Sequence, residues 1–203
     1  MAERFLDKVY GVEGADEARS LYDDWASSYD SEVADNGYAT PTRCAKALAL
    51  IARRDTELLD FGCGTGLSGK AFREAGFTTI DGMDLSPQML EQARTKKIYR
   101  NLTAIDADGK LPFRRGAYQA IAAVGVIGSG AAPLSLFDQL FNSLGPGGLF
   151  VFSFNDHTLK DPTFEARVSD AFLAGEAKIR HREYGPHLPA RKMKSIVYIL
   201  EKQ

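Results

Sequence analysis

Cysteine and histidine are scarce in this sequence: its 203 residues include two cysteines and three histidines. Cys44 and Cys63 lie far apart, and neither belongs to a Cys-x-x-Cys pair or has a histidine beside it. Structural zinc sites and disulfide frameworks need closely spaced or paired cysteines, so both are disfavoured and we expect no metal. The scarcity of cysteine fits a reducing compartment, most simply the cytoplasm.

A large excess of charge and a long apolar run are also lacking. The formal net charge is −2, which gives no general attraction toward nucleic acid or anionic lipid. The first residues, MAERFLDKVYG, lack the apolar core of a signal peptide, and no apolar run is long enough to span a bilayer. We expect a globular protein, monomeric or homodimeric, with no nucleic-acid or membrane partner.

Strand-like and helix-like segments alternate through the middle of the chain. Strands are predicted at residues 57–61, 77–85, 102–106, 118–126 and 147–154. Helices are predicted at residues 65–75, from Ser86-Pro87 onward, where a capping residue precedes proline, and at residues 133–144. This alternation predicts a parallel sheet with helices on both of its faces.

The two ends of the chain depart from this alternation. Helical texture at residues 16–34 and 42–53, broken by NGYATP, predicts a helical cap or lid over residues 1–53, with the core in residues 54–203. Near the end, KIRHREY and KSIVYILEK are strand-like runs that GPHLPARKM joins without a helix. They predict an antiparallel hairpin at the edge of the sheet.

Three glycines, Gly62, Gly64 and Gly66, follow the first predicted strand in LLDFGCGTG. In a doubly wound sheet this turn lies at the carboxyl edge, where ligands bind, and glycine lets the backbone approach a ligand closely. The dinucleotide fingerprint G-x-G-x-x-G would need glycine at Leu67, so the third glycine comes one residue early. Asp60 stands two residues before the first glycine. A tight turn that only starts a helix would also explain the glycines.

The D-x-G-x-G-x-G pattern resembles the first motif of the class I methyltransferases, which bind S-adenosylmethionine (SAM). In that family the acid suits the ammonium group of SAM, through water and loop amides. Asp84 ends the second predicted strand, where an acid accepts both ribose hydroxyls in SAM and NAD sites alike. IDADGKLPF resembles the D-A-x-x-L-P-F segment of small-molecule methyltransferases, in which the acid bonds the adenine amine. Asp106 and Ala107 match, and one extra residue leaves Asp108 as an alternative.

Other segments carry the same resemblance. LYDDWASSYD resembles the Y-D-x-W-A-x-x-Y-D element that precedes the core of many small-molecule methyltransferases. Its aromatic residues cover the cofactor in that family; Tyr29 is our candidate, whereas an amphipathic helix that buries its aromatic stripe explains Trp25. SLGPGGLFVFSF matches the family as a helix, turn and strand, so the matches span residues 21–154. A weaker likeness, in VGVIGSG and the terminal hairpin, is to methyltransferase-like proteins of the Williams–Beuren region type.

The resemblance implies a set of cofactor-binding residues at the ends of the strands. They are Tyr29, Asp60, Gly62, Cys63, Gly64, Gly66, Asp84, Leu85, Met89, Asp106, Ala107 and Val124. In this set Leu85 and Met89 would flank the adenine, although such residues more often belong to the core. Val124 would lie near the methionine part of SAM.

Methyl transfer from SAM is an in-line displacement, so a base is needed only where the acceptor must lose a proton. His157, in the loop after the last core strand, is the candidate base because the pKa of histidine is near neutral. Tyr29 is the second catalytic candidate. His187, in the terminal hairpin, reaches the same face with a weaker case.

The sequence thus predicts a Rossmann-like, doubly wound α/β fold with a mostly parallel, seven-stranded sheet and an antiparallel C-terminal hairpin. The resemblance implies a SAM-dependent methyltransferase that acts on a small-molecule acceptor and releases S-adenosylhomocysteine. Two alternatives stay open. One is a SAM-binding methyltransferase-like protein without catalysis; the other is an NAD(P)-dependent oxidoreductase, against which Leu67 and the hairpin both argue.

Overall fold

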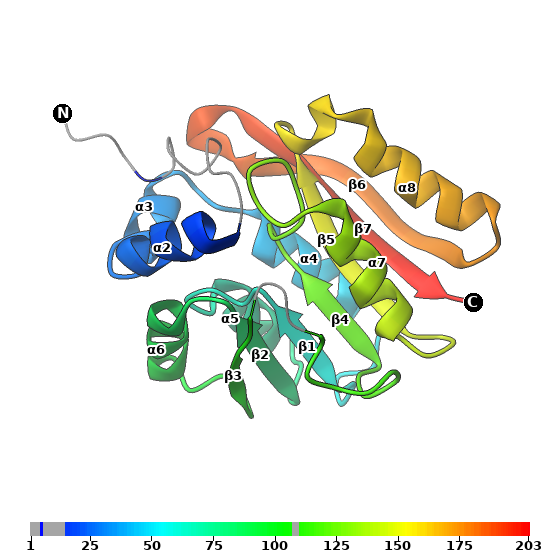
Figure 1. Cartoon of the computed structure of the whole chain (residues 1–203), viewed down its shortest axis with the longest axis horizontal. Coiled ribbons are helices and arrows are strands. Elements are labelled where there is room, and N and C mark those ends of the chain that lie inside the picture. The colour runs from blue at the N-terminus through cyan, green and yellow to red at the C-terminus, as the bar shows by residue number, and fades with distance from the viewer. Residues whose placement is uncertain (1–4, 6–14, 107–109) are drawn as a thin grey trace.

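The computed structural model describes residue 5, residues 15–106 and residues 110–203. Its centre is a seven-stranded sheet with the strand order β3-β2-β1-β4-β5-β7-β6 (Figure 1). The strands are β1 (Leu58–Phe61), β2 (Ile80–Asp84), β3 (Leu102–Ala104), β4 (Ala120–Ala123), β5 (Leu149–Asn155), β6 (Ala177–Leu188) and β7 (Met193–Lys202). β7 pairs antiparallel with β5 and β6, and the other pairs are parallel. The predicted fold class is confirmed, with β7 inside the sheet and β6 at its edge.

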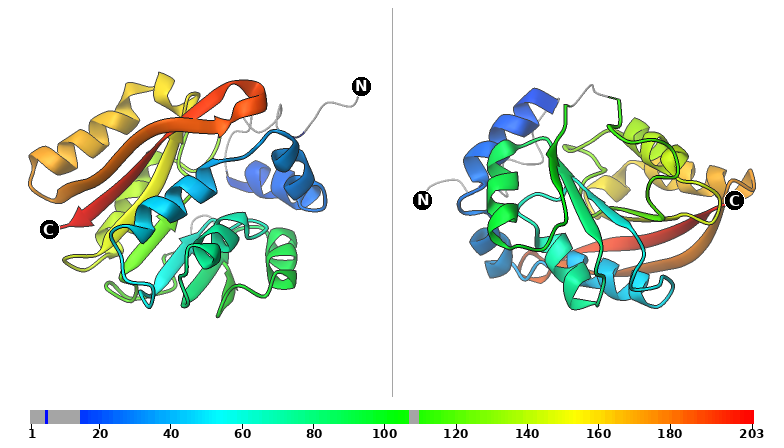
Figure 2. Two further views of the ribbon diagram at one scale, coloured as in Figure 1. Left: turned by 180° about the vertical axis from the view of Figure 1, so that it is seen from behind. Right: turned by 90° about the horizontal axis from the view of Figure 1, so that it is seen from below.

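Helices cover both faces of the sheet (Figure 2). The helices of the described residues are α2 (Ala15–Trp25), α3 (Tyr29–Asp35), α4 (Thr40–Ala49), α5 (Leu67–Glu74), α6 (Pro87–Thr95), α7 (Leu134–Ser143) and α8 (Pro162–Leu173). α4 and α5 pack on one face and α7 and α8 on the other, whereas α6 packs against β2 and β3. None of these described helices has the length and apolar content that crossing a membrane requires.

The central strands are buried on both faces, which explains their continuous apolar runs. In β1, Leu58 belongs to the core beneath α4 and α5, and Leu59 to the core beneath α7 and α8. On β5, the rings of Phe150, Phe152 and Phe154 follow one another with centroid distances of 4.8 and 5.1 Å. Aromatic pairs of this kind add about 0.5–1.5 kcal/mol beyond area burial. The sheet is therefore tightly packed, which holds the strand ends and the loops that follow them in fixed positions.

Packing divides the N-terminal helical region into two parts. The helix predicted at residues 16–34 is broken at residues 26–28, and α2 and α3 bury Trp25 and Val33 against Leu188 of the hairpin. α4 instead packs on the sheet, where its apolar face meets α5 and β7. The sequence assigned α4 to the cap, whereas in the structure it shares the core of the sheet.

The loops that follow the parallel strands lie together at one edge of the sheet. The carboxyl ends of β1, β2, β4 and β5 meet there, and the β6–β7 turn lies at the same edge because β7 runs in the opposite direction. α2 and α3 lie over this edge (Figures 1 and 2). This arrangement places a helical cover above the expected ligand site.

Candidate functional site

The loop after β1 uses glycine for two different purposes. Gly62 has a φ of 68° and Gly64 a φ of 53°, both in the left-handed region. A Cβ at Gly62 would lie 2.4 Å from Val126 Cγ2, which is closer than a stable contact allows. A Cβ at Gly64 would meet no atom of the described residues within 4 Å. The loop therefore packs on the loop after β4 at Gly62, and it exposes open backbone at Gly64.

Asp60 lies beneath this loop with a fully buried carboxyl group. Ser68 Oγ and Tyr99 Oη donate hydrogen bonds to its Oδ2 at 2.6 and 2.7 Å. Its Oδ1 is buried and has no hydrogen-bond partner among the described residues. Burial raises the pKa of Asp60 to about 6. The carboxylate thus faces the loop from inside, so its charge would act on a ligand across the loop amides and not by direct contact.

Tyr99 is a site residue that was not predicted from the sequence. A Cβ at Gly69, inside α5, would lie 2.2 Å from the Tyr99 hydroxyl oxygen, and a Cβ at Gly82, inside β2, would lie 3.0 Å from its Cδ1. Glycine in the interior of a helix or strand often marks such a close approach. These two glycines were therefore a usable signal that a side chain crosses here to reach Asp60.

Asp84 ends β2 and joins the glycine loop to the start of α6. Its Oδ2 accepts from the N–H of Gly64 at 2.7 Å, and its Oδ1 accepts from the N–H of Ser86 at 2.9 Å. Each carboxylate oxygen keeps a second lone pair, and the residue is only partly buried. Burial raises the pKa of Asp84, against the opposing effect of these backbone hydrogen bonds. The carboxylate fits a ligand that presents two neighbouring hydroxyls, as a ribose does.

Four other expected cofactor residues are buried: Cys63, Gly66, Met89 and Val124. Gly66 is the N-cap of α5. Burial raises the pKa of the Cys63 thiol well above its usual value, so the thiol stays protonated at neutral pH. Met89 is 1% exposed and Val124 is 8% exposed. The Met89 side chain therefore lies in the interior, as the core alternative anticipated.

The segment after β3 runs beside the end of β2. Leu85 is half-buried next to Asp84, and the N–H of Ile105 donates to the Asp84 carbonyl at 3.0 Å. Asp106 follows with an exposed side chain. Ala107 and Asp108 lie outside the described residues, so the choice between the two acids for the adenine amine stays a prediction.

A narrow cavity of about 70 Å³ lies at the same edge, next to the glycine loop. The residues that line it are Tyr22, Trp25, Tyr29, Val33, Tyr38, Gly125, Ile127, Gly128, Ser129, Gly130, Ala131, Ser153, Asn155, Thr158, His187 and Leu188. Aromatic rings from the N-terminal helices dominate one wall. Within the described part of the chain, no aspartate, glutamate, lysine or arginine lines the cavity. The cavity therefore suits an uncharged, flat or apolar group.

His187 lines this cavity, whereas the other two histidines do not. His157 precedes a short 3-10 helix (Thr158–Lys160) after β5, and its role as a base stays a prediction. Tyr29 lines the cavity with its ring edge-on to Trp25, at a centroid distance of 4.6 Å. Burial raises the pKa of Tyr29 well above its usual value, so its hydroxyl remains a hydrogen-bond donor at neutral pH.

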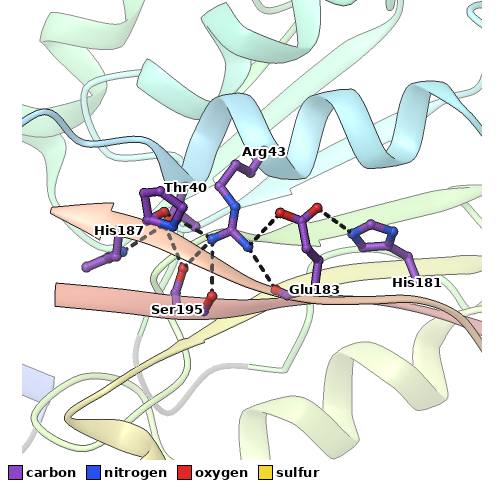
Figure 3. A network of polar contacts seen from close by, with 7 residues as sticks. Thr40, Arg43, His181, Glu183, His187 and Ser195 are labelled. Atoms are coloured by element: carbon purple, nitrogen blue, oxygen red, sulfur yellow. Dashed lines mark hydrogen bonds and ion pairs between the residues drawn. The ribbon is translucent and has the colours of Figure 1, made fainter. Parts of the chain in front are cut away.

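Three residues that were not singled out in the sequence, Thr40, Arg43 and Ser195, connect α4 to His187 (Figure 3). Thr40 lies 147 positions from His187 along the chain. No local pattern reveals a contact over that separation. The network exists because α4 packs across β7 at the edge where the hairpin turns.

Two carboxylates tie α2 and α3 to the cofactor edge. The Ser86 hydroxyl, which also caps α6, donates to Asp23 of α2. Asp30 of α3 accepts from Thr65 Oγ1 at 2.5 Å and pairs with Lys96 Nζ at 2.7 Å. Both carboxylates therefore reach residues beside the glycine loop or beside Asp84.

Comparison with known proteins identifies the family. A family described as a methyltransferase domain matches residues 36–194. Human methyltransferase-like protein 27 is 34% identical over 145 residues, which cover 70% of this chain and 59% of that protein. The 18S rRNA (guanine(1575)-N(7))-methyltransferase of Saccharomyces cerevisiae is 31% identical, covering 69% of this chain and 58% of that protein. The chain thus spans less than two thirds of the length of these curated relatives.

The fold comparison agrees with the sequence comparison. A solved complex of the Haloferax volcanii Trm112 methyltransferase activator with a methyltransferase superposes with a TM-score of 0.68 at 19% identity, covering 91% of this chain and 96% of that chain. The family and fold imply SAM as the cofactor, and the oxidoreductase alternative loses its support. With the matched family covering most of its length, the chain belongs to the methyltransferase domain family.

Proposed function

We propose that the protein transfers a methyl group from SAM to a small-molecule acceptor that enters the cavity beside His187. The position of this cavity is the observation that supports the proposal most. It lies at the same sheet edge as Gly64 and Asp84, and the loops of the two sites touch where Gly62 meets Val126. SAM supplies a methyl group on a positively charged sulfur, already activated for displacement. What remains for the chain is to align the acceptor and exclude water.

In this proposal the residues around the glycine loop divide the work of holding SAM. Asp84 accepts the ribose hydroxyls with the lone pairs that its backbone contacts leave free. Gly64 offers open backbone to the amino-acid part of the ligand. Asp60 supplies negative charge beneath the loop, opposite in sign to the sulfonium and ammonium groups. Asp106 remains the candidate partner of the adenine amine.

The proposed acceptor is a small molecule because the cavity is narrow and roofed by helices. α2 and α3 contribute the aromatic wall, and in this proposal they form the lid that closes over a bound acceptor. The described lining offers no cation to neutralise a phosphate backbone. α4 is part of the core and not of this lid.

A nucleic-acid acceptor is the second candidate function. The yeast relative is named an rRNA methyltransferase, and such names do not support the expectation, based on net charge, that nucleic acid plays no part. A SAM-binding protein without catalysis is the third candidate, because its cofactor residues would be the same.

Two linked measurements distinguish these functions. Titration calorimetry with SAM and S-adenosylhomocysteine, with NADH as the control, tests the cofactor. Transfer of a radiolabelled methyl group from SAM is then measured into a small-molecule cell extract and, separately, into purified ribosomal RNA. Label in the small-molecule fraction supports the proposal, and label only in RNA supports the second candidate. SAM binding without transfer supports the third, and absence of SAM binding overturns all three.

Because the carboxyl group of Asp60 is buried, we predict that stability and SAM affinity change in opposite directions as the pH rises. Its pKa, about 6 in the folded protein, is raised above the value of about 3.9 expected in an unfolded chain. Ionisation therefore costs folded-state stability, which is highest below pH 4 and declines as the pH rises through 6. SAM is a cation, so its affinity should increase several-fold over the same rise from pH 5.0 to 7.5.

The comparison protein for this prediction is Asp60→Asn. Melting temperature without ligand and the Kd for SAM are measured for both proteins from pH 5.0 to 7.5. The difference between wild type and variant removes the contributions of other groups, including Asp84, whose pKa is also raised. A difference in SAM affinity that does not change with pH would contradict the proposed role of Asp60.

The lid proposal predicts a faster release of ligand when Asp30 is neutralised. Asp30→Asn removes the ion pair with Lys96 and weakens the contact with Thr65, which join α3 to the cofactor edge. We expect S-adenosylhomocysteine to dissociate several-fold faster, with faster hydrogen exchange over residues 15–35. Asp35→Asn, an exposed position at the end of the same helix, is the matched control. Equal dissociation rates for the two variants would contradict the lid.

A further inference from the structure

A continuous chain of hydrogen bonds runs from a guanidinium group to the cavity. Arg43 Nη1 donates to Ser195 Oγ at 3.0 Å, and Ser195 Oγ lies 2.9 Å from Thr40 Oγ1. Thr40 Oγ1 lies 2.8 Å from His187 Nδ1 (Figure 3). The guanidinium is fixed by further donation to the carbonyls of Glu183 at 2.8 Å, Pro186 at 3.0 Å and Ser195 at 3.1 Å.

Counting protons gives this chain a direction. Arginine only donates, so Ser195 Oγ is an acceptor at its first contact. If Ser195 then donates to Thr40, the single hydroxyl proton of Thr40 is left for His187 Nδ1, and each hydroxyl donates once. In the opposite direction, His187 Nδ1–H donates to Thr40 and Thr40 donates to Ser195. Ser195 Oγ then accepts from both Thr40 and Arg43, and its own hydroxyl proton has no acceptor among these residues. Thr40 and Ser195 are fully buried, where an unsatisfied donor costs about 1–3 kcal/mol.

The direction of the chain decides which nitrogen of His187 carries the proton. Nδ1 accepts from Thr40, so a neutral ring carries its proton on Nε2. The surroundings keep the ring neutral: burial lowers the pKa of His187 to about 4, with Arg43 lowering it further and Asp156 opposing them. His187 lines the cavity, and its Nε2 lies on the ring edge away from Thr40.

We propose that this chain fixes His187 as the neutral Nε2–H form, so that it donates a hydrogen bond to an uncharged, flat methyl acceptor. The inference deepens the proposed function and depends on it for the identity of the ligand as a methyl acceptor. An Nε2–H group cannot take a proton, so His187 selects and orients the acceptor and is not the general base. Its partner on the acceptor is a carbonyl oxygen, an ether oxygen or an unprotonated ring nitrogen.

The rest of the cavity supports the same class of acceptor. The Tyr38 ring meets His187 edge-on at a centroid distance of 5.2 Å, and Trp25 and Tyr29 provide further aromatic surface. A flat ring is the shape that such walls contact best. No described lining residue is an acid or a strong base, so a charged group would lose its water there without gaining an ion-pair partner.

Nitrogen NMR of protein labelled with ¹⁵N-histidine tests the tautomer directly, with and without S-adenosylhomocysteine. The expected result is a protonated Nε2 and an unprotonated Nδ1 for His187, unchanged from pH 7.5 to pH 5.5. Thr40→Val should disturb this state, whereas Thr40→Ser, which keeps the hydroxyl, should preserve it. A protonated Nδ1, or a charged ring at pH 7, would overturn the proposal.

Two variants of His187 separate a donor from a base. His187→Gln keeps an N–H near the position of Nε2 but cannot act as a base, and His187→Phe keeps the ring but has no donor. The probes are benzamide and benzylammonium, titrated into protein saturated with S-adenosylhomocysteine. We expect benzamide to bind more tightly than benzylammonium, to lose about tenfold in affinity in His187→Phe, and to change by less than about threefold in His187→Gln.

Each other outcome of the probe titration counts against the proposal. Tighter binding of benzylammonium, no binding of either probe, or equal benzamide affinity for wild type and His187→Phe would overturn it. S-adenosylhomocysteine binding and melting temperature show whether the variants are folded. If the wild-type protein binds neither SAM nor S-adenosylhomocysteine, the proposed function fails, whereas the tautomer is still measured on the ligand-free protein.

Discussion

Gly62→Ala is expected to lower the melting temperature by about 10 °C and to abolish measurable SAM binding. The new Cβ would lie 2.4 Å from Val126 Cγ2 and 3.0 Å from Val126 Cγ1. The left-handed backbone costs a residue with a Cβ about 1–2 kcal/mol, and forcing packed side chains apart costs about 1–3 kcal/mol more. These losses are large beside a net stability of about 5–15 kcal/mol. A shift of the loop also disturbs the hydrogen bond that Gly64 N–H donates to Asp84.

Three companion variants isolate the causes. Gly116→Ala has a similar φ of 74° and, in the part of the chain that the structure describes, no atom within 4 Å of the new Cβ, so it measures the backbone cost alone. Gly64→Ala should melt like Gly116→Ala yet lose SAM binding, because its methyl group would occupy the open face. Adding Val126→Ala to Gly62→Ala should recover part of the lost stability. Equal melting temperatures for Gly62→Ala and Gly116→Ala would contradict the predicted collision.

The glycine loop shows which features of the site can be predicted from the sequence and which cannot. The spacing of Gly62, Gly64 and Gly66 after an apolar run predicts a tight turn at the carboxyl edge, and the structure places all three in the left-handed region. The sequence does not reveal that Gly62 and Gly64 serve different purposes. That difference depends on Val126, which another strand brings to the loop. Backbone conformation is encoded locally, whereas the neighbours of a turn depend on the whole fold.

The helices give a second comparison between local and distant information. α8 was not predicted, although Asp161 caps its start, Pro162 occupies its first turn and Gly175 follows its end. Its signals were thus present in the sequence. The break between α2 and α3 differs, because Trp25 and Val33 settle against Leu188 from the other end of the chain. Tertiary packing decides that break, and helical periodicity alone does not show it.

The hydrogen-bond chain to His187 is the part of the site that was least predictable from the sequence. His187 had a weaker case than His157, because the sequence places His157 directly after the last core strand and His187 in the terminal hairpin. Its partner is Thr40, and Thr40 in turn contacts Ser195, 155 positions away along the sequence. Separated positions of ordinary polar type carry no pattern until the sheet order is known. The class of sheet was accessible, since alternating strands and helices followed by a hairpin predicted a mostly parallel sheet with an antiparallel addition at its edge.

Different groups hold the key residues of the two halves of the site in place. On the cofactor side, the carboxylate of Asp84 accepts hydrogen bonds from two backbone N–H groups, which fix its position. The acceptor side is organised by the Arg43 chain, which fixes the donor on His187. Preorganisation of both sides lowers the ordering cost that binding must overcome. A substitution that keeps shape but changes hydrogen-bonding character is therefore expected to be severe.

Asp84→Asn is such a substitution, and it should weaken SAM binding about 100-fold, or about 3 kcal/mol. The amide has one acceptor oxygen, so its NH₂ group must face the N–H of either Gly64 or Ser86, which leaves a donor unsatisfied at a cost of about 1–3 kcal/mol. The ribose hydroxyls also lose a charged acceptor, which makes stronger hydrogen bonds than a neutral one. Calorimetry with SAM and thermal melting measure the two effects.

The ribose contact is separated from damage to the loop by changing the ligand as well as the protein. Wild type should prefer adenosine over 2′-deoxyadenosine, and Asp84→Asn should lose most of that preference if the carboxylate holds the hydroxyls. Asp55→Asn, an exposed acid before β1, is the control for a general loss of charge and should bind SAM like wild type. SAM affinity within about threefold of wild type in Asp84→Asn would remove Asp84 from the site. A retained preference for adenosine despite weak binding would show that Asp84 acts through the shape of the glycine loop, by its hydrogen bond to Gly64, and not by contact with the ribose.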